Sequence, residues 1–221
     1  MSESIQGEHL DRTFVGAQAA GERVTGGDYE RVRFERGAFT GTRFDDCRFE
    51  RVVFAHCELT TASFANCTLR DVSFVSCRMM GINWTTVRPL TLSMRFEQCR
   101  LDNSVFAGMK LKKLAAIECG LVGVDFTGCD LSGARFPQSD LSAAIVRQAT
   151  LLETDLTGTR GCAIDLRTCK LGATRIDLGT ARHVPWDGGV PFFLGEFVNA
   201  DGTPHAQCPR QALKRVLKRA E

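Results

Sequence analysis

The sequence has no hydrophobic run long enough to cross a membrane. A spanning helix needs about 20 mostly apolar residues, and none occurs among these 221 residues. The first twelve residues, MSESIQGEHLDR, are polar, so no secretory signal peptide is predicted. The 10 cysteines include no CxxC pair, so neither a zinc ribbon nor a redox motif is indicated. These absences predict a reduced, cytoplasmic protein.

The sequence also lacks an excess of one charge and lacks the motifs of enzymes. Its 28 basic and 26 acidic residues give a net charge of +2, which does not predict direct nucleic-acid binding. No P-loop, GxGxxG, HExxH or GxSxG motif is present, and the four histidines are scattered. Catalysis needs clustered titratable groups. We therefore predict a protein that is not an enzyme and uses no cofactor, metal or membrane.

What is present is a large apolar residue at every fifth position. From Phe34 to Trp84 all eleven positions in this register are large and apolar. The register shifts by two residues before Phe96, then continues to Ile176, broken only at Ala116 and Gly161. Twelve of the 15 phenylalanines occupy these positions, which we call centres. A period of five matches neither the 3.6 of a helix nor the 2 of a strand.

The residue two places before each centre, which we call its partner, is mostly small or β-branched. Partner, outward residue and centre alternate as in a strand, and the next two residues are often Asp, Asn, Gly, Thr or Ser, which suit turns. Four such corners close a square coil of about twenty residues. At Ala116 the partner is Leu114, so large and small side chains exchange places, whereas Gly161 suggests a local bulge or kink. Eight cysteines are partners and are expected to act as small hydrophobic side chains: Cys47, Cys57, Cys67, Cys77, Cys99, Cys119, Cys129 and Cys169.

Several stretches resemble the pentapeptide repeat family, whose consensus is A(D/N)LXX. DLSGA at 130–134, DLSAA at 140–144 and DLTGT at 155–159 match it closely. The resemblance covers about residues 14–181. It implies an all-β fold, a right-handed quadrilateral β-helix with one repeat per face. We expect about eight coils within residues 1–183, stacked at about 4.8 Å.

Longer runs, 77–111, 124–144 and 161–166, resemble the topoisomerase-protecting branch of this family, with its albicidin-resistance and Qnr-type members. This resemblance implies a protein that binds DNA gyrase, a type II topoisomerase. It would protect gyrase from a quinolone- or albicidin-like poison, giving resistance or self-immunity, with an acidic rod as a DNA mimic. The charge departs from that pattern: subtracting five basic and four acidic residues beyond Pro185 from 28 and 26 leaves 23 and 22. The alternative is a binding scaffold whose partner is unrelated to gyrase.

The period fails in two places, which hold the candidate contacts. Near residues 85–94 we expect either a bulged corner without a role or a projecting loop that binds the partner protein through Thr86, Val87, Arg88, Pro89 and Leu90. Residues 184–221 form the second, an aromatic segment followed by a short α-helix at about 209–220. This tail would cap the solenoid or make a homodimer through Trp186, Phe192, Phe193, Phe197, Leu213, Val216 and Leu217.

Overall fold

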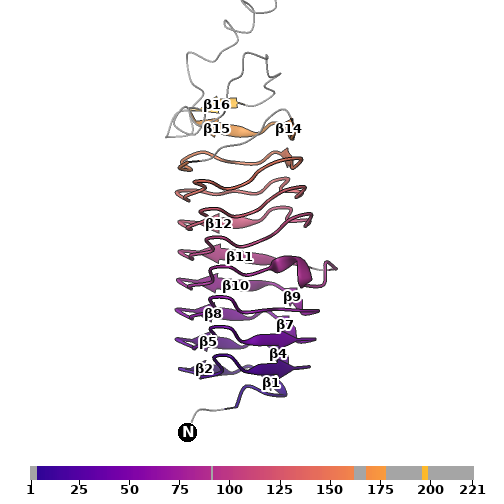
Figure 1. Ribbon diagram of the computed structural model, residues 1–221, viewed down its shortest axis with the longest axis vertical. Helices are drawn as coiled ribbons and strands as arrows, with labels where there is room; N and C mark the ends of the chain where they lie inside the picture. The colour runs from indigo at the N-terminus through magenta and orange to yellow at the C-terminus, as the bar shows by residue number, and fades with distance from the viewer. Residues whose placement is uncertain (1–3, 91, 162–167, 178–195, 199–221) are drawn as a thin grey trace, which may run out of the picture.

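The computed structural model describes residues 4–90, 92–161, 168–177 and 196–198. The chain winds into a solenoid whose coils lie one above another (Figure 1). All the strand pairs in this described part are parallel, and residues that pair are 20 apart along most of the chain, as in Phe14 with Phe34. Because the repeat is five residues and the coil twenty, each coil has four sides.

The pairing defines four faces. The first face holds β1 (Glu8–Leu10), β4 (Asp28–Glu30), β7 (Arg48–Glu50) and β9 (Thr68–Arg70), and further along β13 (Thr150–Leu152) and β14 (Lys170–Gly172). The second face is the longest sheet, with β2 (Thr13–Val15), β5 (Arg33–Glu35), β8 (Val53–Ala55), β10 (Val72–Val75), β11 (Met94–Glu97) and β12 (Ala115–Ile117) in spatial order. On the same face, β15 (Arg175–Asp177) pairs with β16 (Glu196–Val198).

The other two faces are built largely from single-residue bridges. The third face runs through Ala38, Glu58, Arg78, Arg100, Gly120, Asp140 and Arg160. The fourth begins with β3 (Arg23–Thr25) and β6 (Arg43–Asp45) and continues through Asn83, Val105 and Asp125. Its one 3-10 turn among the described residues, η1, spans Trp84–Thr86. The quadrilateral all-β solenoid predicted from the sequence is thus confirmed.

Left-handed backbone turns each corner at the second residue after a centre. Four consecutive corners show this, at Arg51, His56, Thr61 and Asn66, with φ between 54° and 56°. Most residues other than glycine avoid this region, at a cost of about 1–2 kcal/mol per residue. At Arg51, His56 and Thr61 the left-handed backbone is therefore imposed by the ladders that join successive coils and not by local preference.

The centres fill the middle of the solenoid as two aromatic columns. Phe14, Phe34, Phe54, Phe74 and Phe96 stack with ring centroids 4.9–5.3 Å apart. A parallel column contains Phe44, Phe64, Trp84, Phe106 and Phe126, with centroids 5.2–5.7 Å apart. The two columns meet edge to face, and their rings are at most 1% exposed. This packing explains why the period tolerates so few small residues at centres.

Candidate functional site

The two extra residues form a loop that leaves the first face. Regular pairing with the previous coil persists up to Arg88, whose N–H donates to the carbonyl of Cys67 at 2.9 Å. It resumes at Ser93, whose N–H donates to the carbonyl of Leu69 at 3.0 Å. Backbone bonds of this kind join residues 21 apart before the loop, as in Arg88 to Cys67, and 23 apart after it, as in Arg100 to Cys77, so the two extra residues lie between Arg88 and Ser93. Figure 1 shows this loop projecting sideways next to η1.

Most of the predicted loop contacts lie at the surface, but one does not. Thr86, Arg88 and Pro89 are exposed, and Leu90 is 81% exposed. Val87 is a correction: it is 6% exposed because it keeps the inward partner position of the repeat. The frame is therefore broken after Val87, not at it, and four of the five predicted contacts are exposed: Thr86, Arg88, Pro89 and Leu90. Arg88 also pairs with Asp46 at 3.3 Å, which fixes the base of the loop.

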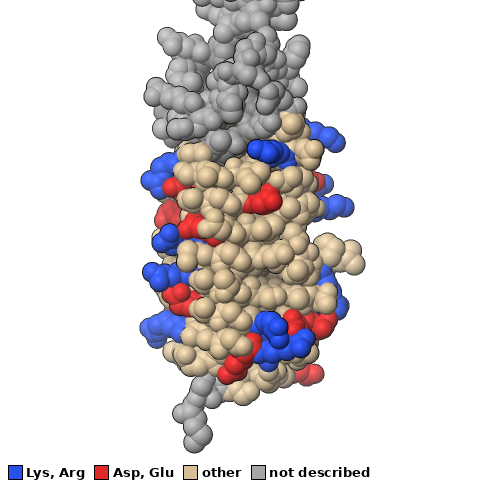
Figure 2. All heavy atoms as spheres, in the orientation of Figure 1, with Lys and Arg blue, Asp and Glu red and all other residues tan. Residues whose placement is uncertain are grey.

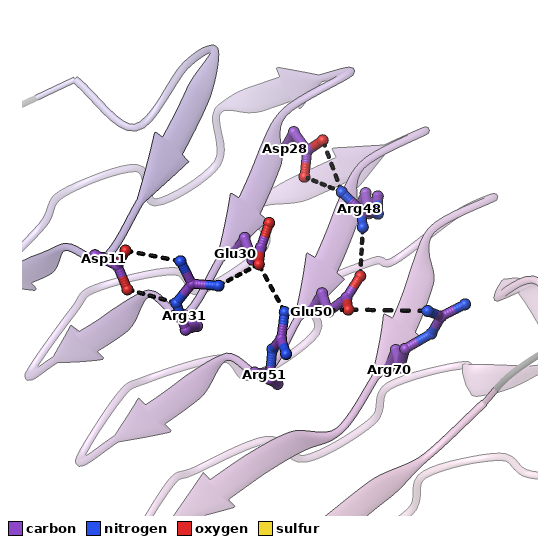
Figure 3. A network of polar contacts seen from close by, with 8 residues as sticks. All are labelled: Asp11, Asp28, Glu30, Arg31, Arg48, Glu50, Arg51 and Arg70. Carbon is purple, nitrogen blue, oxygen red and sulfur yellow. Dashed lines mark hydrogen bonds and ion pairs between the residues drawn. The ribbon is translucent and has the colours of Figure 1, made fainter.

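A network of ion pairs covers the first face near the start of the chain (Figure 3). Arg31 makes two bonds with Asp11, at 2.6 and 2.8 Å, and also pairs with Glu30. The network continues through Arg51, Glu50, Arg48, Asp28 and Arg70. Its four arginines and four carboxylates balance, and the arginine side chains are 43–50% exposed. Such exposed pairs contribute about 0–1 kcal/mol each, so the network stiffens a polar face without creating a charged site.

This network was missed in the sequence, although a signal was present. Asp11 with Arg31 and Asp28 with Arg48 are each 20 residues apart, the length of one coil. Writing the sequence in rows of twenty would have placed these opposite charges next to each other.

Charge is mixed on the described surface as a whole. Figure 2 shows Lys and Arg beside Asp and Glu, with uncharged surface between them. The one concentration of lysines in the described part of the first face is Lys110, Lys112 and Lys113, and Lys112 pairs with Asp130 at 3.4 Å. No continuous acidic stripe follows any face in the described part of the solenoid. An interaction driven by a uniform negative field is therefore not built into this surface.

The cysteine columns lie in the core. Seven partner cysteines are at most 2% exposed, and Cys169 is partly buried. Seven of the eight thiols donate to carbonyls of the preceding coil, as Cys129 does to Phe106 at 3.0 Å, while Cys119 donates to Ile117 of its own coil. Hydroxyl groups at partner positions make the same kind of bond, as when the Ser139 hydroxyl donates to the carbonyl of Ala116 at 2.9 Å. The eight cysteines are all free thiols, and the described residues contain no group of His, Cys, Asp and Glu that could hold a metal.

The ionisation of Cys129 gives a testable pH dependence. Burial raises the pKa of this thiol from 9.0 to about 11. Below pH 9 the thiol is neutral in the folded and unfolded chain, and its contribution to stability is complete. Between about pH 9 and 11 only the unfolded chain loses the proton, so the free energy of unfolding falls, by about 2 kcal/mol for this one group. Cys129→Ser keeps a donor for Phe106 but does not ionise, and we expect a shallower decline over this pH range. Chemical denaturation at a series of pH values measures it, and identical slopes for both proteins would contradict it.

The predicted tail contacts lie outside the described residues. These are Trp186, Phe192, Phe193, Leu213, Val216 and Leu217, together with the helix at about 209–220. Phe197 falls within β16, whose backbone pairs with β15 and so adds one rung to the second face. The capping and dimer roles of the tail stay predictions. No helix in the described residues is long and apolar enough to cross a membrane.

Similar proteins are found among curated sequences and solved structures. Type-1 glutamine synthetase 2 of Dictyostelium discoideum is 47% identical over 45 residues, 20% of this chain and only 9% of that protein. A trypsin-treated variant of QnrB1, described as a plasmid-mediated fluoroquinolone resistance protein, is 23% identical with a TM-score of 0.40, covering 79% of this chain and 94% of that one. HetL from the cyanobacterium Nostoc sp., described as involved in heterocyst differentiation regulation, is 14% identical with a TM-score of 0.32, covering 78% and 91%.

Family models match two parts of the solenoid. A model of the pentapeptide repeat region matches residues 28–88. A second model, of pentapeptide repeats in eight copies, matches residues 119–159. Both matches fall where the five-residue period builds the four faces, on either side of the loop. This chain belongs to the pentapeptide repeat family.

Proposed function

We propose that this chain is a non-enzymatic protein that binds DNA gyrase and protects it from a topoisomerase poison. Protection from a quinolone- or albicidin-like compound would give resistance or self-immunity. The proposal rests on the runs at 77–111 and 124–144, which resemble the topoisomerase-protecting branch beyond the bare repeat consensus. The first of these runs contains the loop.

The observation that carries the proposal is the loop itself. A filled solenoid offers flat faces, and its sides differ only in outward side chains. Leu90 stands 81% exposed on the segment that departs from a face, next to exposed Pro89 and Arg88. Arginine is enriched among the residues that dominate binding energy at protein interfaces, so Arg88 beside the apolar Pro89 and Leu90 is suited to contact a larger partner.

The near balance of basic and acidic residues bears on whether this chain could bind gyrase by imitating DNA. A rod that imitates duplex DNA would present closely spaced negative charge to the basic groove of its target. The balance of 23 basic and 22 acidic residues up to Pro185 does not supply that field. Contact through the loop and through rod shape is therefore preferred over electrostatic mimicry in this proposal.

The mixed surface charge also favours the second candidate, a binding scaffold with a partner unrelated to gyrase. The two candidates predict different results in one assay. Gyrase supercoiling and DNA cleavage are measured with ciprofloxacin or albicidin present while this protein is titrated. Recovery of supercoiling with less trapped cleavage supports protection. Absence of recovery at every concentration, with no gyrase retained on the immobilised protein, supports the scaffold.

Removal of the loop tests its role within that assay. Residues Pro89–Leu92 are replaced by Leu-Arg, the pair found at Leu69–Arg70 of the preceding coil, which restores the five-residue frame. We expect the variant to keep its stability, because a centre and an outward residue replace a projecting segment. We expect protection to fall about tenfold or more, as for loss of a central contact.

The matched control keeps the loop and changes its base. Asp46→Asn removes the exposed ion pair with Arg88, keeps a residue that tolerates the left-handed backbone of this corner, and should change protection by much less than loop removal. Full protection by the loopless variant, with a folded circular dichroism spectrum, would remove the loop from the proposal.

A further inference from the structure

The second face has two columns of residues on either side of its centres, and two of its rungs carry an arginine in one column beside a glutamate in the other. The first column precedes the centres and contains Thr13, Arg33, Val53, Ser73, Arg95, Ala115 and Arg135. The second column follows the centres and contains Val15, Glu35, Ala55, Val75, Glu97, Ile117 and Pro137. Wherever the first column holds an arginine on a strand of this sheet, the second holds a glutamate, and elsewhere on these strands both are uncharged.

The charged rungs already show this complementarity within one chain. Arg33 pairs with Glu35 at 2.8 Å, and Arg95 pairs with Glu97 at 3.1 Å. Both arginine side chains are about half exposed, 46% and 51%. Between these rungs lie Val53, Ser73 and Val75, which are partly exposed, and Ala55, which is buried, so an uncharged band separates two ion pairs.

We propose that the second face is the surface at which two copies of this chain pack side by side, in parallel and in register. A two-fold axis parallel to the solenoid exchanges the two columns, so the first column of one copy faces the second column of the other. Arg33 then meets Glu35 of the second copy, and Arg95 meets Glu97. The uncharged rungs meet each other through their partly exposed residues, as with Ser73 of one copy and Val75 of the other.

The antiparallel arrangement is disfavoured by the same columns. A two-fold axis perpendicular to the solenoid keeps each column opposite itself. With the axis between β8 and β10, Arg33 would face Arg95, and Glu35 would face Glu97. Like charges directly opposite are destabilising, so the pattern selects the parallel arrangement.

The size of this face sets the expected strength. Seven rungs at about 4.8 Å and three residues of about 3.3 Å each give a flat area of roughly 330 Å² per copy, or about 670 Å² in all. Stable interfaces bury about 1,200–2,000 Å². We therefore expect a weak dimer that depends on protein concentration and salt. The corner residues at the edge of this face would contribute in both directions. Glu118 would face the oppositely charged Lys113 of the second copy, whereas Arg36 would face Arg31, which carries the same charge.

This dimer is compatible with binding through the loop. The loop leaves the first face, and Figure 1 shows it pointing away from the strands of the second face. Side-by-side pairing would leave both loops of the dimer accessible. The inference rests on the second face alone and does not depend on gyrase.

Charge exchange in the full-length chain tests the arrangement. One variant carries Glu35→Arg with Glu97→Arg, so both columns become basic at the charged rungs. The other carries Arg33→Glu with Arg95→Glu, so both become acidic. We expect each variant alone to dissociate, with a dissociation constant raised about tenfold or more by like charges. An equimolar mixture should associate again, because each basic rung meets an acidic one. Sedimentation equilibrium over a concentration series measures all three samples.

The control makes the same charge change on other faces. Arg48→Glu with Arg78→Glu alters the first and third faces and should leave association unchanged. A second measurement needs no variant: the dissociation constant of the wild-type protein should rise between about 0.05 and 0.5 M NaCl as ion pairs are screened. The proposal is overturned if the wild-type chain stays monomeric, if both variants associate like wild type, or if their mixture does not associate.

Discussion

Replacement of Phe64 by alanine is expected to lower the free energy of unfolding by about 3–5 kcal/mol. The ring is fully buried, stacked between Phe44 at 5.2 Å and Trp84 at 5.3 Å. Its edges also meet Phe49 and Phe54. Alanine would leave a cavity that the coils above and below cannot close, because their spacing is fixed by the backbone ladders. The cost should therefore lie toward the upper end of this range.

Guanidinium chloride unfolding, followed by far-UV circular dichroism, measures this effect. Ser63→Ala is the matched control, because Ser63 directly precedes Phe64 on the same side of the coil but is partly exposed. A surface change of this kind should alter stability by less than about 0.5 kcal/mol. Equal, small losses at both positions would mean that the five-residue period does not report burial.

The buried residues could be predicted from the sequence, because the place of a residue within the five-residue repeat determines whether its side chain points inward. Phe64 and Cys67 could be assigned inward from their place in the five, and both are fully buried. The exchange of Leu114 and Ala116 was also readable, and both residues lie in the core. Each inward position repeats a local rule, so no knowledge of distant contacts is needed.

The outward residues could not be assigned in the same way. The predicted loop contacts began at Thr86, but Val87 still obeys the repeat, and only pairing between coils shows that the excess lies after Arg88. The bonds of Arg31 to Asp11 likewise depend on which coils lie next to each other. Surface contacts in this fold join residues of different coils, so the sequence of a single repeat does not predict them.

At Gly161 the sequence predicted an irregularity in the coil but not its physical cause. The period predicted a large residue at this centre, and its absence suggested a bulge or kink. The backbone there has φ +65°, which most side chains avoid. A Cβ atom would lie 2.7 Å from the Cα of Ser142 and 2.0 Å from its Oγ. The glycine is thus required by a close approach of the backbone to the preceding coil, which the sequence could mark but not explain.

Gly161→Ala is therefore expected to destabilise the protein by about 2–5 kcal/mol. About 1–2 kcal/mol comes from the left-handed backbone, and a further 1–3 kcal/mol comes from overpacking against Ser142. The Ser142 Oγ could rotate away, but its Cα belongs to the neighbouring coil and cannot move without breaking ladder hydrogen bonds. Chemical denaturation of the purified variant measures the loss.

Gly158→Ala separates the two contributions. Gly158 has a similar φ of +72°, but a Cβ there would meet its nearest atom, the Gln138 N, at an ordinary 3.7 Å. This control should therefore cost only the backbone term, about 1–2 kcal/mol. The difference between the two variants isolates the collision with Ser142. If both variants lose the same stability, the approach of the two coils at Gly161 is looser than described, and the glycine serves only the turn.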